Sequence, residues 1–146
     1  MKRTIFALLC ALAMLFPCAP RAYAAGTDNT AQAAIVVHPE TGTVLYEKNA
    51  DARLGIASTT KIMTGLLVCE QPELDREVTV PAAAAGLEGS SMYLRCGETI
   101  SLRALLYGMM LHSGNDAALA LADCCGGLDA FVQAMNEKAA ALGMKD

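Results

Sequence analysis

Two short runs of β-branched and apolar residues near the start of the chain flank a turn sequence. They span residues 33–38 and 43–48, and Pro39-Glu40-Thr41-Gly42 lies between them. β-branched residues favour extended structure, and proline with glycine favours a reversal of the chain. The pattern predicts a β-hairpin. Because a lone hairpin is barely stable in water, we expect either further strands beside it or a peripheral position.

From Ser58 onward the apolar residues recur every three to four positions, which is the period of an α-helix. The pattern predicts a helix from Ser58 to about Cys69, with Pro72 ending the segment. Because apolar residues cover so much of its surface, we expect this helix to be central rather than on the surface. Its main stripe is expected to hold Ile62, Leu66 and Cys69, with Met63 and Leu67 beside it.

The rest of the chain is predicted to be mainly helical, after some short extended pieces. Strands are expected at residues 77–80 and 89–94, a small helical or irregular piece at 81–86, and a turn at 96–98. Helices are expected at 102–111 with Ser101 as N-cap, at 116–125 ended by Gly126-Gly127, and at 129–142 ended by Gly143. In the last helix Phe131, Met135 and Leu142 are expected to face inward. Strands followed by a cluster of helices predict an α+β domain.

The first 24 residues have the composition of a cleavable export signal. A basic start precedes the apolar run 4–16, and Ala22-Tyr23-Ala24 fits a signal-peptidase site. We therefore predict a signal peptide over residues 1–24. A transmembrane anchor is the alternative, but thirteen residues are few for spanning a bilayer. Lipid attachment at Cys18 is disfavoured because a proline precedes it.

Loss of the signal peptide makes the chain more acidic. Residues 1–24 hold three basic and no acidic residues, so the formal net charge changes from −4 to −7. An acidic chain without a basic patch argues against nucleic acid as a partner and against electrostatic docking on anionic lipid. The remaining cysteines are Cys69, Cys96, Cys124 and Cys125, with no Cys-x-x-Cys pair to suggest zinc. They allow three disulfide pairings that sequence cannot rank, and we interpret them as small buried apolar side chains.

Candidate chemistry begins with Ser58 and Lys61. A spacing of three places both side chains on one helical face, about one turn apart. Serine is a poor nucleophile unless an adjacent base takes its proton, and lysine can be that base only while its amine is neutral. Apolar Ile56, Ile62 and Met63 nearby are compatible with the necessary desolvation. Alone, however, Ser-x-x-Lys also fits an N-capping serine followed by a solvated lysine.

A second polar cluster, Ser113-Gly114-Asn115, lies between two predicted helices. A loop there can present a hydroxyl and a carboxamide to one point, where Ser113 relays a proton and Asn115 holds the lysine or a substrate peptide group. Asp116 is interpreted as a capping carboxylate at a helix N-terminus, and His38 and His112 as surface or packing residues. Ser-x-x-Lys followed by Ser-x-Asn is a signature of penicillin-interacting serine enzymes.

With both motifs in this order, the chain resembles the low-molecular-weight D-alanyl-D-alanine carboxypeptidases, serine peptidases among the penicillin-binding proteins. The resemblance extends from residue 33 to residue 146. It includes the segments LYEKNAD, IASTTKIMTGLL, EGSSMYLRCGETISL, LLYGMMLHSGNDAALALAD and FVQAMNEKAAALGMKD. It implies a β-lactamase/transpeptidase-like α+β fold, in which a cluster of helices packs on an antiparallel sheet.

The resemblance also implies a role for each matching residue. Ser58 would be the acylated nucleophile, Lys61 its general base, Ser113 a proton-transfer group and Asn115 a substrate-orienting group. The implied substrates are peptidoglycan stem peptides ending in D-Ala-D-Ala, cleaved outside the cytoplasm, with β-lactams as inhibitors that acylate the same serine. No cofactor and no metal ion are implied. The alternatives are a β-lactamase or peptidoglycan endopeptidase of the same superfamily, and a non-catalytic cell-wall-binding module.

One motif of the family is missing. Neither Lys-Thr-Gly nor Lys-Ser-Gly, expected on a sheet strand, occurs in the 146 residues. Family members continue past the position of Asp146, with further strands, an oxyanion-hole donor and often an amphipathic membrane anchor. We therefore expect residues 25–146 to be the N-terminal part of the catalytic domain, with little activity alone. Membrane attachment is expected only through a C-terminal segment absent from this sequence.

Overall fold

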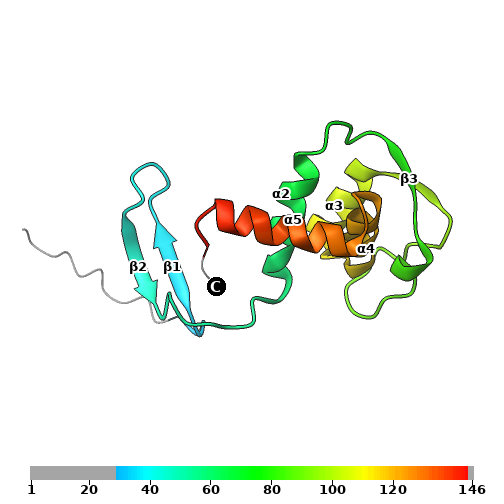
Figure 1. Cartoon of the computed structure of the whole chain (residues 1–146). Helices are drawn as coiled ribbons and strands as arrows, with labels where there is room; N and C mark the ends of the chain where they lie inside the picture. Colours follow the sequence, from blue (N-terminus) through cyan, green and yellow to red (C-terminus); the bar gives the residue numbers. More distant parts are fainter. Residues whose placement is uncertain (1–28, 145–146) are drawn as a thin grey trace, which may run out of the picture. The chain divides into compact units, whose positions relative to one another are not determined.

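The computed structural model describes residues 29–144, so the predicted signal peptide lies outside the described residues. The chain divides into two units between Ala52 and Arg53. Figure 1 shows the elements of each unit.

The first unit contains the predicted hairpin. Strand β1 (Ala34–Val37) pairs antiparallel with strand β2 (Val44–Lys48). At the turn, Gly42 has a φ of +68°, a left-handed conformation that glycine adopts without steric penalty. The hairpin prediction is therefore confirmed. Apolar side chains such as Ile35 and Leu45 stay exposed, as expected of an element that cannot bury its own surface.

The second unit combines helices with a small antiparallel sheet. Its helices are α2 (Lys61–Cys69), α3 (Leu102–His112), α4 (Asn115–Cys124) and α5 (Leu128–Ala141), with 3-10 turns η1 (Ala57–Thr60) and η2 (Ala82–Ala84). Its strands are β3 (Glu77–Thr79) and β4 (Thr99–Ser101), which pair antiparallel. The α+β prediction is confirmed. Between residues 29 and 144 no single helix is long and apolar enough to cross a membrane, although α4 and α5 meet the test together as a pair bent by 93°.

The core of this unit lies where α3 and α4 pack together, with α2 and α5 against them (Figure 1). Small residues on the buried side of α4, Ala117 and Ala120, allow the helices to approach closely. The buried apolar residues are Leu67, Val68, Val78, Val80, Ala84, Leu94, Leu102, Leu105, Met109, Ala117, Ala120, Leu121, Ala122 and Phe131.

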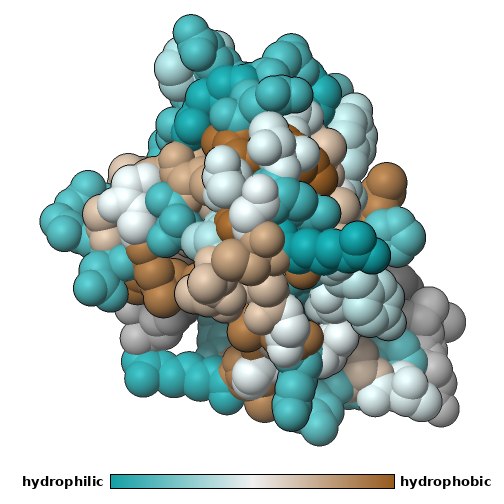
Figure 2. Space-filling model, turned by 90° about the vertical axis from the view of Figure 1, so that its right-hand side faces the viewer, coloured by the Kyte–Doolittle hydropathy of each residue, from teal (hydrophilic) through white to brown (hydrophobic). Residues whose placement is uncertain are grey.

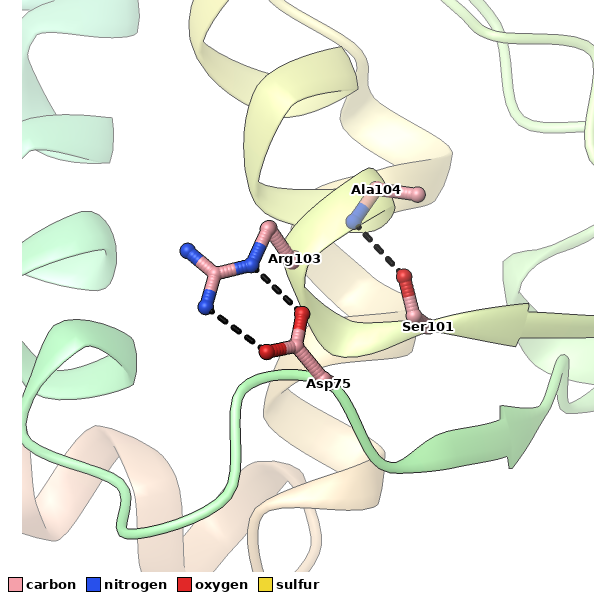
Figure 3. A network of polar contacts seen from close by, with 4 residues as sticks. All are labelled: Asp75, Ser101, Arg103 and Ala104. Atoms are coloured by element: carbon pink, nitrogen blue, oxygen red, sulfur yellow. Dashed lines mark hydrogen bonds and ion pairs between the residues drawn. The ribbon is translucent and has the colours of Figure 1, made fainter.

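Local capping chemistry fixes the beginning of α3. Ser101 is the N-cap, and its Oγ accepts a hydrogen bond of 3.2 Å from the backbone N–H of Ala104 (Figure 3). Asp75 and Arg103 form a two-pronged ion pair beside this cap, with N–O distances of 2.6 and 3.0 Å. The predicted cap is thus confirmed, because the serine oxygen satisfies an N–H that has no partner within the helix.

The face that α2 buries differs from the prediction. Ile62 is 63% exposed and Leu66 38%, whereas Lys61 and Val68 are buried. The buried side of α2 therefore contains Lys61 with its polar contacts, described below, and not the widest apolar stripe. Exposed apolar side chains also occur on other elements of this unit, and Figure 2 shows apolar patches between hydrophilic ones on one face of the molecule.

Two predictions of secondary structure differ from the structure: the start of the first helix and the strand at residues 89–94. The α-helix does not begin at Ser58, because residues 57–60 form a 3-10 turn and α2 starts at Lys61. Residues 89–94 form no strand, because Met92 and Leu94 donate their backbone N–H groups to a side-chain carboxylate instead of to a neighbouring strand.

Two expectations about burial are also wrong. Leu142 is 59% exposed, since α5 ends at Ala141. Cys69 and Cys96 are exposed, while Cys124 and Cys125 pack against the core and are half-buried. All four thiols are free, and burial raises the pKa of the Cys124 and Cys125 thiols. The expectation of buried cysteines therefore fails for Cys69 and Cys96.

Candidate active site

Lys61 is the first residue of α2, and its side chain is buried at 8% exposure. Its Nζ donates to the backbone oxygen of Ser113, to Ser113 Oγ at 3.1 Å and to Asn115 Oδ1 at 2.7 Å. All three of these acceptors are neutral groups. The structure therefore brings Lys61, Ser113 and Asn115 together around one buried amine.

Ser113 has a backbone conformation that suits this contact. It ends α3 with φ 54° and ψ 33°, in the left-handed region. For a residue with a side chain this conformation costs about 1–2 kcal/mol, and such strain is concentrated at functional sites. The turn directs both the carbonyl and the hydroxyl of Ser113 at Lys61 Nζ. The strained backbone of Ser113 thus allows two of its oxygens to accept hydrogen bonds from Lys61 Nζ.

Ser58 lies in η1 and is exposed. It lines a cavity of ≈ 370 Å³ together with Lys61 and Ser113, and the remaining lining is largely apolar: Ile56, Ala57, Thr59, Ile62, Met109 and Met110. The three hydrogen bonds of Lys61 Nζ do not include Ser58 Oγ. The cavity therefore gathers the predicted nucleophile and base, while the hydrogen bond between them is not formed; such bonds are often long in unliganded sites.

This arrangement supports acyl-transfer chemistry. A hydroxyl, an amine and a second hydroxyl line one cavity, which is the set of groups that proton transfer to and from a serine nucleophile requires. A carboxamide on the same amine, from Asn115, completes the polar set.

Asp116 has more contacts than the capping role expected from the sequence, because it also binds residues 91–94. It is completely buried in the first turn of α4. Burial alone would raise the pKa of its carboxyl. Hydrogen bonds from Ser91 Oγ and from the backbone N–H groups of Met92, Leu94 and Ala117 together outweigh burial and hold the pKa below its usual value. The available signal was an acidic residue directly before the apolar run of α4.

Acid should weaken the fold through Asp116. A carboxyl whose pKa is lowered by folding stabilises the protein above its unfolded pKa of about 3.9, and this contribution is lost as the pH falls through the folded value. Asp116→Asn should lower the free energy of unfolding at pH 7 by about 3 kcal/mol, since buried N–H groups lose a charged acceptor. Urea unfolding at pH 7 and pH 3 should show the difference between the two proteins shrinking at pH 3. A constant difference would contradict this.

A larger hollow of ≈ 480 Å³ lies elsewhere, beside the Asp75–Arg103 pair (Figure 3). The hydrogen bond from Arg103 lowers the pKa of Asp75, but both side chains are exposed, and exposed ion pairs contribute little to stability. Its lining holds no serine or other hydroxyl. We therefore place the candidate site at the cavity of Ser58 and Lys61.

Comparisons with known proteins identify the family of the chain. The family model for D-alanyl-D-alanine carboxypeptidase matches residues 20–146. The carboxypeptidase DacF of Bacillus subtilis is 37% identical over all of this chain, which covers 41% of that protein. A D-alanyl-D-alanine endopeptidase of Pseudomonas aeruginosa is 41% identical over 77% of this chain and 37% of its own length.

A solved structure extends the comparison to the fold. Penicillin-binding protein D2 of Listeria monocytogenes, in its ampicillin-bound form, superposes with a TM-score of 0.71 and 36% identity over 83% of this chain and 50% of its own. The fold is thus that of the penicillin-binding proteins, as the resemblance implied. The chain spans half or less of the length of these three relatives. By its sequence, its fold and the match over residues 20–146, the chain belongs to the D-alanyl-D-alanine carboxypeptidase family.

Proposed function

We propose that residues 25–146 are the N-terminal part of the catalytic domain of a serine-type D-Ala-D-Ala carboxypeptidase. The contact of Lys61 Nζ with Ser113 and Asn115, at the cavity that Ser58 lines, carries this proposal. The family assignment supports the same chemistry. Residues 1–24 would direct export, which places the enzyme where peptidoglycan is built.

In the proposed reaction, Ser58 Oγ attacks the carbonyl carbon between the two terminal D-alanines. Lys61 accepts the hydroxyl proton and passes a proton to Ser113, which donates its own proton to the leaving amine, so that the C–N bond breaks and D-alanine departs. Water then hydrolyses the acyl-enzyme and restores Ser58. Asn115 orients the substrate peptide group and Lys61. Each proton that leaves one group is thus received by another.

β-Lactams are the proposed inhibitors of the same serine. Their strained amide would acylate Ser58 as the D-Ala-D-Ala bond does, and the bulky product would shield the ester from water. The ampicillin-bound Listeria relative, 36% identical, supports this extension. The described residues offer no carboxylate among the cavity-lining groups that could activate water, which argues against a β-lactamase.

The decisive assay compares two substrates. The complete gene product, whether or not it continues past Asp146, is incubated with a peptide ending in D-Ala-D-Ala and, separately, with benzylpenicillin. We expect release of free D-alanine with multiple turnovers and only slow release of hydrolysed penicillin. Rapid penicillin turnover would instead identify a β-lactamase, and no release from either substrate a binding module.

An endopeptidase is the second candidate, because the Pseudomonas aeruginosa relative carries that name at 41% identity. A cross-linked muropeptide dimer distinguishes it from a carboxypeptidase. Cleavage of the cross-link, without loss of a terminal D-alanine from uncross-linked peptides, would favour the endopeptidase.

A further inference from the structure

A segment without regular structure, residues 88–94, lies along the start of α4 and contacts Asn115 twice. The backbone N–H of Asn115 donates to Ser90 O at 2.7 Å. The side-chain Nδ2 of Asn115 donates to Glu88 O at 2.9 Å. Both the backbone and the side chain of Asn115 are therefore attached to the 88–94 segment.

The contact with Glu88 determines which way the amide of Asn115 points. A backbone carbonyl only accepts hydrogen bonds, so it selects the Nδ2 end of the amide. The Oδ1 end then faces Lys61 Nζ at 2.7 Å. A flipped amide would set oxygen against the Glu88 carbonyl and nitrogen against the amine. The Glu88 carbonyl thus fixes Asn115 as the acceptor for Lys61.

Gly89 makes the close approach possible. Its φ is +90°, and a Cβ at this position would lie 2.8 Å from Asn115 Nδ2. That distance is below any ordinary van der Waals contact, so a side chain here would displace the amide. Gly86, three residues earlier, also has a positive φ of +74°, but a Cβ there would meet nothing within 4 Å.

The other end of the 88–94 segment is held by Asp116. Its carboxylate accepts from Ser91 Oγ at 2.6 Å and from the backbone N–H groups of Met92 and Leu94 at 3.0 Å. Between those residues, Tyr93 has φ 62°, a strained conformation maintained by bonds on both sides. Met92 fills the space over Gly108, where a Cβ would lie 1.7 Å from its Sδ.

We propose that Gly89 and Asp116 are positioning residues, which hold the 88–94 segment against Asn115 and thereby set the Asn115 amide toward Lys61. Asp116 anchors the segment, Gly89 lets it approach, and the Glu88 carbonyl orients the amide. Neither residue lines the cavity that Ser58 and Lys61 share. This inference rests on the proposed function only where it predicts an effect on acylation.

A double-mutant cycle tests whether Gly89 acts through Asn115. The acylation rate constant of the complete gene product with a fluorescent penicillin is measured for Gly89→Ala, Asn115→Ala and the double variant. Gly89→Ala should slow acylation about 10- to 100-fold in the wild-type background, as expected for a misplaced polar group. In the Asn115→Ala background it should slow acylation less than about threefold, because the displaced amide is gone. If Gly89→Ala slowed acylation by the same factor in the wild-type and Asn115→Ala proteins, the proposal would be overturned.

Matched variants separate positioning from folding. Gly86→Ala carries similar backbone strain without the contact, and should leave acylation of the folded protein within about threefold of wild type. Asp116→Asn should slow acylation about tenfold or more, even at a temperature where circular dichroism shows it fully folded. Asp123→Asn makes the same change at an exposed position of the same helix and should have no effect. Slow acylation of the Gly86→Ala variant, or acylation of Asp116→Asn at the wild-type rate, would contradict the positioning role of Gly89 and Asp116.

The orientation of the amide can be measured without any activity. In the complete gene product with ¹⁵N-labelled asparagine, the side-chain NH₂ of Asn115 should exchange with water about tenfold more slowly than that of the exposed Asn136. Gly89→Ala and Asp116→Asn should remove this protection. If no penicillin labels the wild-type protein, the proposed function fails, and the exchange measurement still decides the positioning: unprotected wild-type Asn115 would refute it.

Discussion

Replacing Ser58 by alanine is expected to abolish covalent labelling of the complete gene product by a fluorescent penicillin. The acyl bond forms at the serine oxygen, so its removal leaves no atom for the label, and turnover of a D-Ala-D-Ala peptide should fall by a factor of order 10⁶, as in other serine peptidases. Ser58 is exposed, and its side chain supports no contact of the core. The melting temperature should therefore change little. In-gel fluorescence and D-alanine release measure the two effects.

Thr60→Ala is the matched control for Ser58→Ala. Thr60 is a second exposed hydroxyl in the same 3-10 turn, it does not line the cavity, and its side chain makes no capping hydrogen bond. Labelling of Thr60→Ala should equal that of the wild type. Labelling that persists in Ser58→Ala at equal stoichiometry would show that another residue is the nucleophile, and the role proposed for Lys61 would then fail with it.

Elements that local sequence specifies were predicted well. The hairpin, the Ser101 cap and the three C-terminal helices depend on neighbours within one or two turns, and these elements lie within a few residues of the expected bounds. Turn residues and caps act locally, so the chain itself carries the information.

The failures have a common physical cause in contacts distant along the chain. Residues 89–94 were expected to form a strand, but the Asp116 carboxylate, more than twenty residues later, accepts the N–H groups that a strand would use. α2 likewise turns Lys61 inward, although Ile62 and Leu66 form the more apolar stripe. In both cases one buried polar group outweighed the hydrophobic pattern, because leaving such a group without partners costs about 1–3 kcal/mol.

The site was predictable in composition but not in geometry. Lys61 and Asn115 are 54 positions apart, and only the order of two motifs suggested that they meet. Nothing in the local sequence indicates the left-handed turn at Ser113 or the carbonyl of Glu88 that faces Asn115. These features follow from how α2, α3 and the 88–94 segment pack on α4, which only the three-dimensional structure contains.

Replacing Lys61 by methionine should separate catalysis from stability. Methionine has a similar length and no charge, so it fills the same space without accepting a proton. Loss of a general base lowers the rate of a reaction about 10²- to 10⁴-fold, and we expect the rate of acylation by penicillin to fall by that factor. The free energy of unfolding should fall by no more than about 1 kcal/mol and can rise, because the variant removes a buried amine that has no opposite charge beside it.

Two opposing terms set this stability effect. Lys61→Met leaves the oxygens of Ser113 and Asn115 without their donor, but both residues are only half-buried, so water can replace the amine. The cost of removing the amine from water, in contrast, remains as long as Lys61 is present. Lys138→Met, which breaks the exposed pair with Glu70, is the control and should leave acylation unchanged. If urea unfolding showed Lys61→Met to be several kcal/mol less stable than the wild type, this prediction would be wrong. The hydrogen bonds of the amine would then be needed for folding as well as for the reaction.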